Sequence, residues 1–406
     1  MAATQAFAVP APPAASPEQR TGLDRVLASE SLRTALFASR RIGFVTNFTA
    51  VTNDYRRAVD ALLASGVNIV ALFSPEHGLD GMAQAGHSAG PPVDPRVNLP
   101  VYDTYQLPDS QLDGMVTQAD LDLLICDLQD VGTRFWTYPA TMIACMRAAA
   151  RAKLPFMVLD RPNPLGTEVA EGPVLDPRFT SFIGALPIPL RHGLTLGQLA
   201  RLTAAYDRKH GLPTLDPQVI TGACDHHGFI GQGSLWLPPS PNMATFATAC
   251  VYPGTGLLEG TNVSEGRGTT HPFEMFGAPW IDGRLVELLR SMQLPGVFVR
   301  EVSFIPTFGK YAGEPCRGGY LHVSDPTAFR PVRTGLSVIA ALARLYPDDF
   351  KVLAPARASA PPALDLLWGS GALRLRLERH ENVLALDERT ILDPREIYPQ
   401  VIFEHC

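Results

Sequence analysis

The stretch LDLLICDL at residues 121–128 is followed directly by QDVG at 129–132, and this arrangement decides the fold class. A short apolar run that ends in polar residues is typical of a strand buried on both faces of a parallel sheet. The same pattern recurs in three other places, with helical stretches between them: IGFVTN at 42–47, VNIVALF at 67–73 and PFMVL at 155–159. We therefore predict an α/β protein whose N-terminal domain is Rossmann-like and layered around a mainly parallel sheet.

Changes in this pattern along the chain predict the domain organisation. Residues 1–20 are rich in Ala and Pro and predict a disordered leader. Strand–helix alternation characterises residues 21–248, which we assign to the Rossmann-like domain. Residues 249–406 lose the alternation, with short strand candidates at 297–304 and 319–323 beside helical stretches. We expect this part to form a smaller mixed α/β C-terminal domain.

Composition excludes several classes of function. The chain has 34 Lys and Arg against 40 Asp and Glu, a net charge of −6, without a basic stripe, so nucleic acid is not an expected partner. Its apolar runs are shorter than the ~18 residues of a membrane span. Six cysteines without a CxxC pair argue against a disulfide scaffold or thiolate zinc site. Lacking a convincing signal peptide, the protein is expected in the cytoplasm, or in the periplasm or medium if translation starts upstream.

Polar side chains follow each expected strand of the N-terminal domain. In open α/β sheets, ligands bind outside the carboxyl ends of the strands, so these side chains are expected to share one rim. Any one of them is equally well explained as a helix cap or turn residue. Because every strand ends this way, a shared cleft is favoured over a set of separate caps. The residues concerned are Asn47, Glu76, His77, Asp127, Asp130, Asp160 and Asn163.

The motifs that remain indicate carboxylate chemistry. The sequence has no GxSxG elbow, HExxH pair, P-loop or GxGxxG turn, and we expect neither a metal nor a cofactor. Glu76 follows Pro75, whose ring restricts the backbone and presents the next side chain rigidly. A glutamic acid held beside apolar groups is suited to act as a general acid. The alternative is a structural role for Glu76 in a salt bridge.

Two arginines are candidates for binding an acidic substrate. Arg134 has the geometry to bind a carboxylate with two hydrogen bonds, or else to pair with Asp130. Arg267 and Glu265 form a second charged pair in a loop flanked by glycines. Amide and carboxyl side chains close to aromatic rings suit a sugar, which needs hydrogen bonds at its rim and an apolar ring face. The aromatic residues are Trp136, Tyr138 and Trp236.

Several long motifs resemble the NamZ-type exo-β-N-acetylmuramidases, and the resemblance runs from about residue 41 to 402. They include LFSPEHGLDG at 72–81, DLQDVGTRFWTYPATM at 127–142, VLDRPNPLG at 158–166, PIPLRHGLTLGQLA at 187–200, PPSPNM at 238–243 and YPGTGLLEGTNVSEGRGTTHPFEMFGAPW at 252–280. The resemblance implies an active site between the two domains and cleavage of non-reducing-end N-acetylmuramic acid from peptidoglycan fragments. It also implies that the glutamate of SPEHG, here Glu76, is catalytic.

We therefore predict a glycoside hydrolase that releases β-linked N-acetylmuramic acid from small muropeptides or related amino sugars. Glu76 is expected to protonate the glycosidic oxygen; the candidates for the second carboxyl role are Asp127, Asp130 and Glu265. The 2-acetamido group of the substrate is an alternative nucleophile. A non-catalytic peptidoglycan-binding protein and a sugar transferase on the same fold remain alternatives. Candidate binding residues are Arg134 and Arg267 for the lactyl carboxylate, Asn47, Asn163, Asn242 and Asn262 for hydroxyls, and in addition His77, Tyr138, Asp160 and His192.

Overall fold

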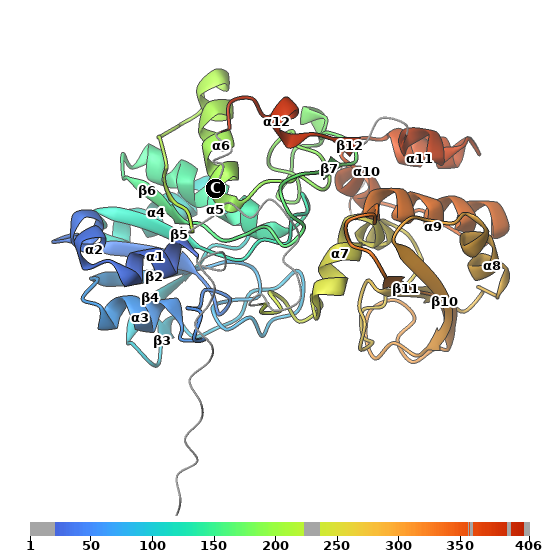
Figure 1. Cartoon of the computed structure of the whole chain (residues 1–406), viewed down its shortest axis with the longest axis horizontal. Helices are drawn as coiled ribbons and strands as arrows, with labels where there is room; N and C mark the ends of the chain where they lie inside the picture. Colours follow the sequence, from blue (N-terminus) through green and yellow to red (C-terminus); the bar gives the residue numbers. More distant parts are fainter. Residues whose placement is uncertain (1–20, 223–235, 356, 358–359, 388–390, 402–406) are drawn as a thin grey trace, which may run out of the picture.

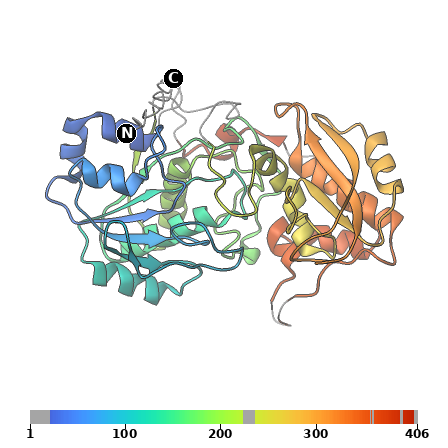
Figure 2. The same ribbon diagram turned by 90° about the horizontal axis from the view of Figure 1, so that it is seen from below.

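The computed structural model describes residues 21–222, 236–355, 357, 360–387 and 391–401. The predicted leader at residues 1–20 lies outside this range. The described chain forms two lobes that lie side by side, the first coloured blue to green and the second yellow to red (Figures 1 and 2).

The N-terminal lobe is built on one mainly parallel sheet, as the sequence predicts. Within the described residues its strand order is β3-β4-β2-β1-β5-β6-β8, and only the β3–β4 pair is antiparallel. The central strands β1 and β5 are buried along their whole length, which explains their unbroken apolar sequences. The strands are β1 (Ile42–Thr46), β2 (Ile69–Ser74), β3 (Val93–Asp94), β4 (Leu99–Asp103), β5 (Leu123–Asp127), β6 (Phe156–Leu159) and β8 (Gln218–Ile220).

Helices cover both faces of this sheet, because neighbouring residues of each strand point to opposite sides. On β1, Phe44 packs in a core with Leu23 and Leu62 from the flanking helices, whereas Val45 packs in a second core with Met142. The helices of this lobe are α1 (Gly22–Ala28), α2 (Glu30–Phe37), α3 (Ala58–Ala64), α4 (Asp109–Ala119), α5 (Thr137–Arg151) and α6 (Leu196–His210), with a short 3₁₀ turn η2 (Pro177–Phe179).

The C-terminal lobe is a smaller mixed α/β unit, again as predicted. Its antiparallel sheet has the order β10-β11-β9, and helix α9 packs against α7 and α8 beside it. The boundary expected at residue 248 lies inside helix α7. The elements are α7 (Phe246–Thr255), η3 (Gly256–Gly260), β9 (Met275–Ala278), α8 (Arg284–Ser291), β10 (Val297–Phe304), β11 (Cys316–Val323), α9 (Pro331–Leu345), α10 (Ala363–Trp368), α11 (Ala372–Glu378) and η4 (Val383–Asp387).

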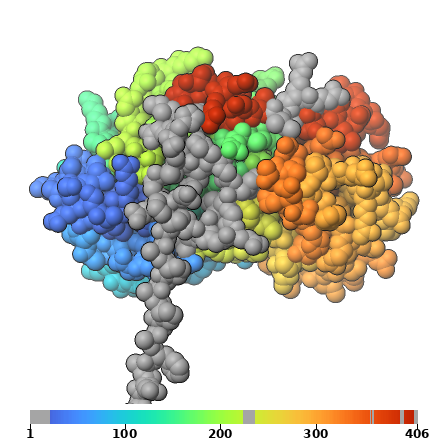
Figure 3. Space-filling view, viewed as in Figure 1, coloured from blue at the N-terminus to red at the C-terminus, as the bar shows by residue number. Residues whose placement is uncertain are grey.

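The end of the described chain returns to the N-terminal lobe and ties the two lobes together. Strand β12 (Ile391–Leu392) pairs with β7 (Ala170–Glu171), and Pro394 at the start of α12 (Pro394–Ile397) lies close to Gly193, shortly before α6. Figures 1 and 3 show this end of the chain, in red, over the N-terminal lobe. Glu171 of β7 makes a contact from the N-terminal lobe to the C-terminal lobe. Its Oε1 accepts hydrogen bonds from the backbone N–H groups of Val332 and Arg333 at the start of α9. Among the described residues, no helix combines the length and apolar character needed to cross a bilayer.

Candidate active site

A cavity of about 250 Å³ lies between the two lobes. One side is formed by the loops that follow β2 and β4 and by the start of α5, and the other by α7, η3 and the loop before β9. Among the described residues, Glu76 and Glu259 are the acidic side chains that line it, one from each lobe. The other charged or polar lining residues are His77, Tyr105, Thr137, Ser240, Asn242, Tyr252 and Arg267.

Glu76 is held by hydrogen bonds to both of its carboxyl oxygens. The backbone N–H of Gly86 donates to Oε1 at 2.6 Å, and the hydroxyl of Thr137 donates to Oε2 at 2.6 Å. Thr137 is the first residue of α5, so the positive end of that helix lies next to the carboxyl group. The Glu76 side chain is buried, yet it borders the cavity. This position places one fixed carboxyl group at the wall of the cavity.

The loop that carries Glu76 folds back over it because of two unusual backbone positions. His77 and Gly78 have φ values of 73° and 79°, in the left-handed region. A side chain at Gly78 would collide with the carbonyl oxygen of Ala89, so only glycine fits there. Nδ1 of His77 lies 2.8 Å from the carbonyl oxygen of Ala83, which identifies Nδ1 as the protonated nitrogen. Burial lowers the pKa of His77, and the charge of Glu76 opposes this only in part.

Tyr105 borders the cavity beside Glu76, although the sequence did not single it out. It follows β4, which pairs in parallel with the strand that ends just before Glu76. Burial, and after it the charge of Glu76, raises the pKa of the Tyr105 hydroxyl. The phenol therefore stays protonated at neutral pH and is available as a hydrogen-bond donor inside the site.

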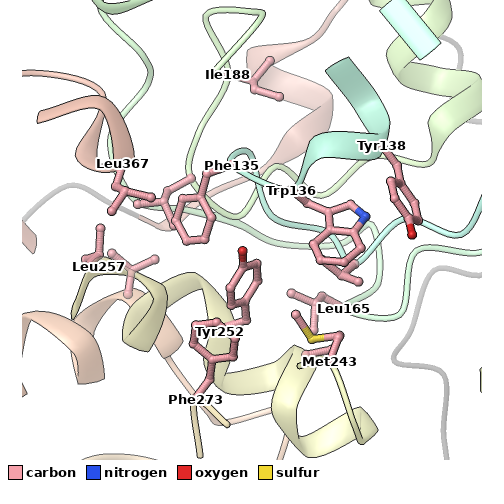
Figure 4. Packing of buried hydrophobic residues seen from close by; sticks show 14 of the residues in the cluster. Phe135, Trp136, Tyr138, Leu165, Ile188, Met243, Tyr252, Leu257, Phe273 and Leu367 are labelled. Atoms are coloured by element: carbon pink, nitrogen blue, oxygen red, sulfur yellow. The ribbon is translucent and has the colours of Figure 1, made fainter. Parts of the chain in front are cut away.

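Aromatic rings from both lobes pack together (Figure 4), and four of them line the cavity. Tyr252 of α7 packs edge-on against Phe135 at 4.9 Å and against Trp136 at 6.2 Å between ring centroids. Its other neighbour is Phe273, at 4.7 Å. All four rings line the cavity, which gives it the apolar surface that the face of a sugar ring needs.

The C-terminal wall carries a cluster of two acids and two bases. Nη2 of Arg267 donates to Oε1 of Glu259 at 2.7 Å, and its Nε lies 3.3 Å from Oε1 of Glu265. Lys310 donates to the second oxygen of Glu265 at 2.9 Å. Burial lowers the pKa of Arg267, but the charges of Glu259 and Glu265 and the hydrogen bond to Glu259 act against it, and the net effect is a raised pKa. Arg267 is therefore a permanent cation at the cavity wall, with its plane over the ring of Phe273.

The three predicted candidates for the second carboxyl role lie away from the cavity lining. Asp127 is fully buried and bonded through both oxygens to Arg161. Burial raises the pKa of Asp127, and the charge of Arg161 opposes it. Asp130 accepts a hydrogen bond from the backbone of Gly132, and its Oδ2 lies 3.1 Å from Nε2 of His192. Glu265 has both oxygens engaged, by Arg267 and by Lys310.

Several predicted binding residues instead hold the loops of the N-terminal lobe in place. Asn47 donates to the hydroxyl of Tyr138, which donates to the carbonyl of Pro239. Asp160 accepts hydrogen bonds from Thr195 and from the backbone of Gly197 at the start of α6. Asn163 donates to the carbonyl of Leu194. The backbone N–H of Leu194 in turn donates to Nδ1 of His192. These side chains are buried, and none of them lines the cavity.

Of the remaining predicted residues, some line the cavity and others stabilise the surrounding structure. Arg134 donates to the carbonyls of Pro173, Ile188 and Leu367, so it joins the two lobes, and burial lowers its pKa to about 9. Asn262 bonds to the backbone of Asp349 and Lys351. Asn242 does line the cavity, where its amide donates to Oε1 of Gln84. The structure thus brings Glu76, His77, Asn242 and Arg267 together around one space.

Comparison with known proteins assigns the family. The family model described as "Exo-beta-N-acetylmuramidase NamZ, N-terminal" matches residues 42–247, and the corresponding C-terminal model matches residues 250–393. The chain belongs to the NamZ family.

Individual relatives agree with this family assignment. The chain is 41% identical over 387 residues to the peptidoglycan β-N-acetylmuramidase NamZ of Bacillus subtilis, covering 93% of this chain and 89% of that protein. Among solved structures, a DUF1343 family protein of Bacteroides fragilis matches with a TM-score of 0.78 and 31% identity, over 89% of this chain and 91% of the other. A second DUF1343 protein from the same organism matches with a TM-score of 0.70 and 26% identity, over 95% and 99%.

Five of the polar and charged cavity residues of this NamZ-family chain were not among the predicted site residues: Tyr105, Thr137, Ser240, Tyr252 and Glu259. A signal for Glu259 was present, since Glu-Gly occurs at 259–260 and again at 265–266 in one glycine-rich loop. Only the second of these glutamates was selected from the sequence. In the structure Glu259 lines the cavity, whereas Glu265 forms an ion pair with Arg267 and does not line it.

Proposed function

We propose that this protein is an exo-β-N-acetylmuramidase, a glycoside hydrolase that removes β-linked N-acetylmuramic acid from the non-reducing end of peptidoglycan fragments. The family models carry that activity in their description, and the Bacillus subtilis relative is a peptidoglycan β-N-acetylmuramidase. The observation in the site that carries the proposal is the position of Glu76, a buried carboxyl group fixed at the wall of a small cavity.

The size of the cavity supports removal of single terminal sugars. Its volume of about 250 Å³ lies below the roughly 300–1,000 Å³ of pockets that hold drug-sized ligands. A space of this size accommodates one sugar ring rather than several consecutive rings of a glycan strand. The substrate is therefore a small peptidoglycan-derived molecule whose terminal residue enters the cavity.

Glu76 acts as the general acid in this proposal. Its proton passes to the glycosidic oxygen as the bond from that oxygen to the anomeric carbon breaks. The carboxylate that remains is stabilised by the N–H of Gly86, the hydroxyl of Thr137 and the positive end of α5. Tyr105 offers a further donor next to it.

Arg267 supplies recognition of the acidic group that distinguishes N-acetylmuramic acid from other amino sugars. The lactyl ether of this sugar carries a carboxylate, and a guanidinium binds carboxylates with two parallel hydrogen bonds. No acceptor among the described residues bonds Nη1 of Arg267, although its Nε and Nη2 are used by Glu259. Asn242 also lines the cavity, and its amide is available to bond a hydroxyl or acetamido group.

The test is the variant Glu76→Gln, which keeps the shape of the side chain but has no carboxyl proton to give. We expect turnover of the disaccharide of N-acetylmuramic acid β-linked to N-acetylglucosamine to fall by about 10³-fold, the range for loss of a general acid. The unfolding temperature should stay close to that of the wild type. Released sugar is measured by chromatography.

Two other outcomes of this assay would replace the proposal. A wild-type protein that binds the disaccharide by calorimetry but releases no sugar would be a peptidoglycan-binding protein. Sugar release that requires an activated donor and an acceptor would identify a transferase. Wild-type turnover in the Glu76→Gln variant would remove Glu76 from the mechanism while leaving the hydrolase assignment in place.

A further inference from the structure

Glu259 is a second acidic group on the cavity, and the protonation of the leaving group by Glu76 does not involve it. It belongs to η3 in the C-terminal lobe, so it faces the cavity from the lobe opposite to Glu76. Its side chain keeps 27% of its surface exposed, against 6% for Glu265 in the same loop. Glu259 is therefore accessible from the cavity, whereas Glu265 is enclosed.

The hydrogen bonds of Glu259 leave one oxygen open. Both Nε and Nη2 of Arg267 bond to Oε1, at 3.2 and 2.7 Å. No donor among the described residues bonds to Oε2. Asp127 and Glu265, by contrast, have both oxygens engaged by basic side chains. A carboxylate that is oriented through one oxygen and open at the other is arranged to accept a proton.

Electrostatics support the same reading. Burial raises the pKa of Glu259, and the charge of Arg267 opposes this shift. A carboxylate with a raised pKa is a stronger base than an ordinary glutamate, and Arg267 keeps it in the ionised form that a base requires.

Building on the proposed function, we propose that Glu259 is the general base that activates the attacking water. The water oxygen forms a bond to the anomeric carbon, and its proton moves to Oε2 of Glu259. At the same time the bond from the anomeric carbon to the glycosidic oxygen breaks, and Glu76 gives its proton to that oxygen. Exchange with solvent then returns one proton to Glu76 and removes one from Glu259.

This arrangement predicts the stereochemistry of the reaction. Glu76 and Glu259 both line the cavity, and they come from different lobes. In this proposal the sugar ring lies between them, with the attacking water on the side of Glu259. Acid and base on opposite sides of the ring invert the anomeric centre. The first product formed from the β-linked substrate is therefore the α-anomer of N-acetylmuramic acid.

The deciding experiment compares Glu259→Gln with Glu76→Gln on two substrates, the disaccharide and 4-nitrophenyl β-N-acetylmuramide. Nitrophenolate leaves without protonation, so Glu76→Gln should lose much less activity on the aryl substrate than on the disaccharide. Attack of water is needed for both, so Glu259→Gln should lose about 10²- to 10⁴-fold on both. Glu378→Gln, in an exposed pair on α11, is the matched control and should behave as the wild type.

Two further measurements separate chemistry from structural support. Azide added to Glu259→Ala should restore turnover of the aryl substrate and give the α-glycosyl azide, because the anion takes the place of the activated water. A structural role would give no rescue. In the pH profile, the acid limb of the wild type should disappear in Glu259→Gln. NMR of the wild-type reaction should show the α-anomer first.

The possible failures are distinguishable. If the wild type acts on neither substrate, the proposed function fails and the role of Glu259 with it. If the wild type is active and Glu259→Gln keeps its rate within about fivefold, only the general base fails. A β-anomer as first product would also overturn the general base, since it requires a covalent or acetamido-assisted intermediate.

Discussion

The carboxyl rim of the parallel sheet and the wall of the cavity carry the same kinds of side chain, but these side chains bond differently. On the rim, Asp127 and Asp160 have their oxygens bonded to neighbouring loops and to Arg161. On the cavity wall, Glu259 and Arg267 keep donors and acceptors that face open space. The difference shows that a position at the end of a strand does not by itself determine whether a polar residue has a structural or a catalytic role. What decides it is whether the side chain itself reaches the cavity between the lobes: the loop after Asp127 contacts the second lobe through Arg134 and Phe135, yet Asp127 does not line the cavity.

The largest effect that this comparison predicts is on folding, from Arg161→Met. The variant leaves Asp127 buried without a partner, and loss of one member of a buried ion pair costs about 3–5 kcal/mol. We expect the free energy of unfolding, measured with urea, to fall by that amount. Activity per folded molecule should remain within a few-fold of the wild type, since neither residue lines the cavity.

The double variant Arg161→Met/Asp127→Leu is the control for this prediction. Replacing both members of a buried ion pair by apolar groups is often close to neutral, so most of the stability should return. A fully stable double variant that has lost its activity would contradict the comparison, because it would give the rim a part in the reaction.

The next effect is on specificity, from Arg267→Gln. Hydrogen bonds to a charged group contribute about 1.5–3 kcal/mol, which corresponds to roughly 10- to 100-fold in kcat/KM. We expect the kcat/KM of the variant to fall by this additional factor on 4-nitrophenyl β-N-acetylmuramide, compared with its fall on 4-nitrophenyl β-N-acetylglucosaminide. The second substrate lacks the lactyl carboxylate. The ratio of the two values is the measurement, because any effect through Glu259 lowers both. An unchanged ratio would show that Arg267 does not bind the lactyl group.

The fold was predictable where strands are buried on both faces. The strands β1, β2, β5 and β6 lie in unbroken apolar runs, and the structure confirms each within two residues. Strand β4, with the sequence LPVYD, was missed because it is partly exposed and contains Pro100. Strands β3 and β8, at the sheet edges, are two and three residues long, too short to show any periodicity.

The same limits explain which site residues could be found. Glu76 stands directly after a buried strand and a proline, so its position could be inferred locally. Tyr105 was missed together with the strand that precedes it. Glu259 lies in a glycine-rich loop without periodicity, and its approach to Glu76 depends on how two lobes dock. Hydrophobic patterning describes each lobe by itself and carries no information on the space between them.

The smallest expected effect comes from Asn262→Ala. The sequence placed Asn262 among residues that bind sugar hydroxyls, whereas in the structure its amide bonds to the backbone of Asp349 and Lys351 at the edge of the C-terminal lobe. Loss of these partly exposed hydrogen bonds should lower the free energy of unfolding by about 1 kcal/mol. The value of kcat/KM should stay within twofold of the wild type. A tenfold fall in kcat/KM at unchanged stability would instead place Asn262 in contact with the substrate, and the division between supporting residues and cavity residues would have to be redrawn at that position.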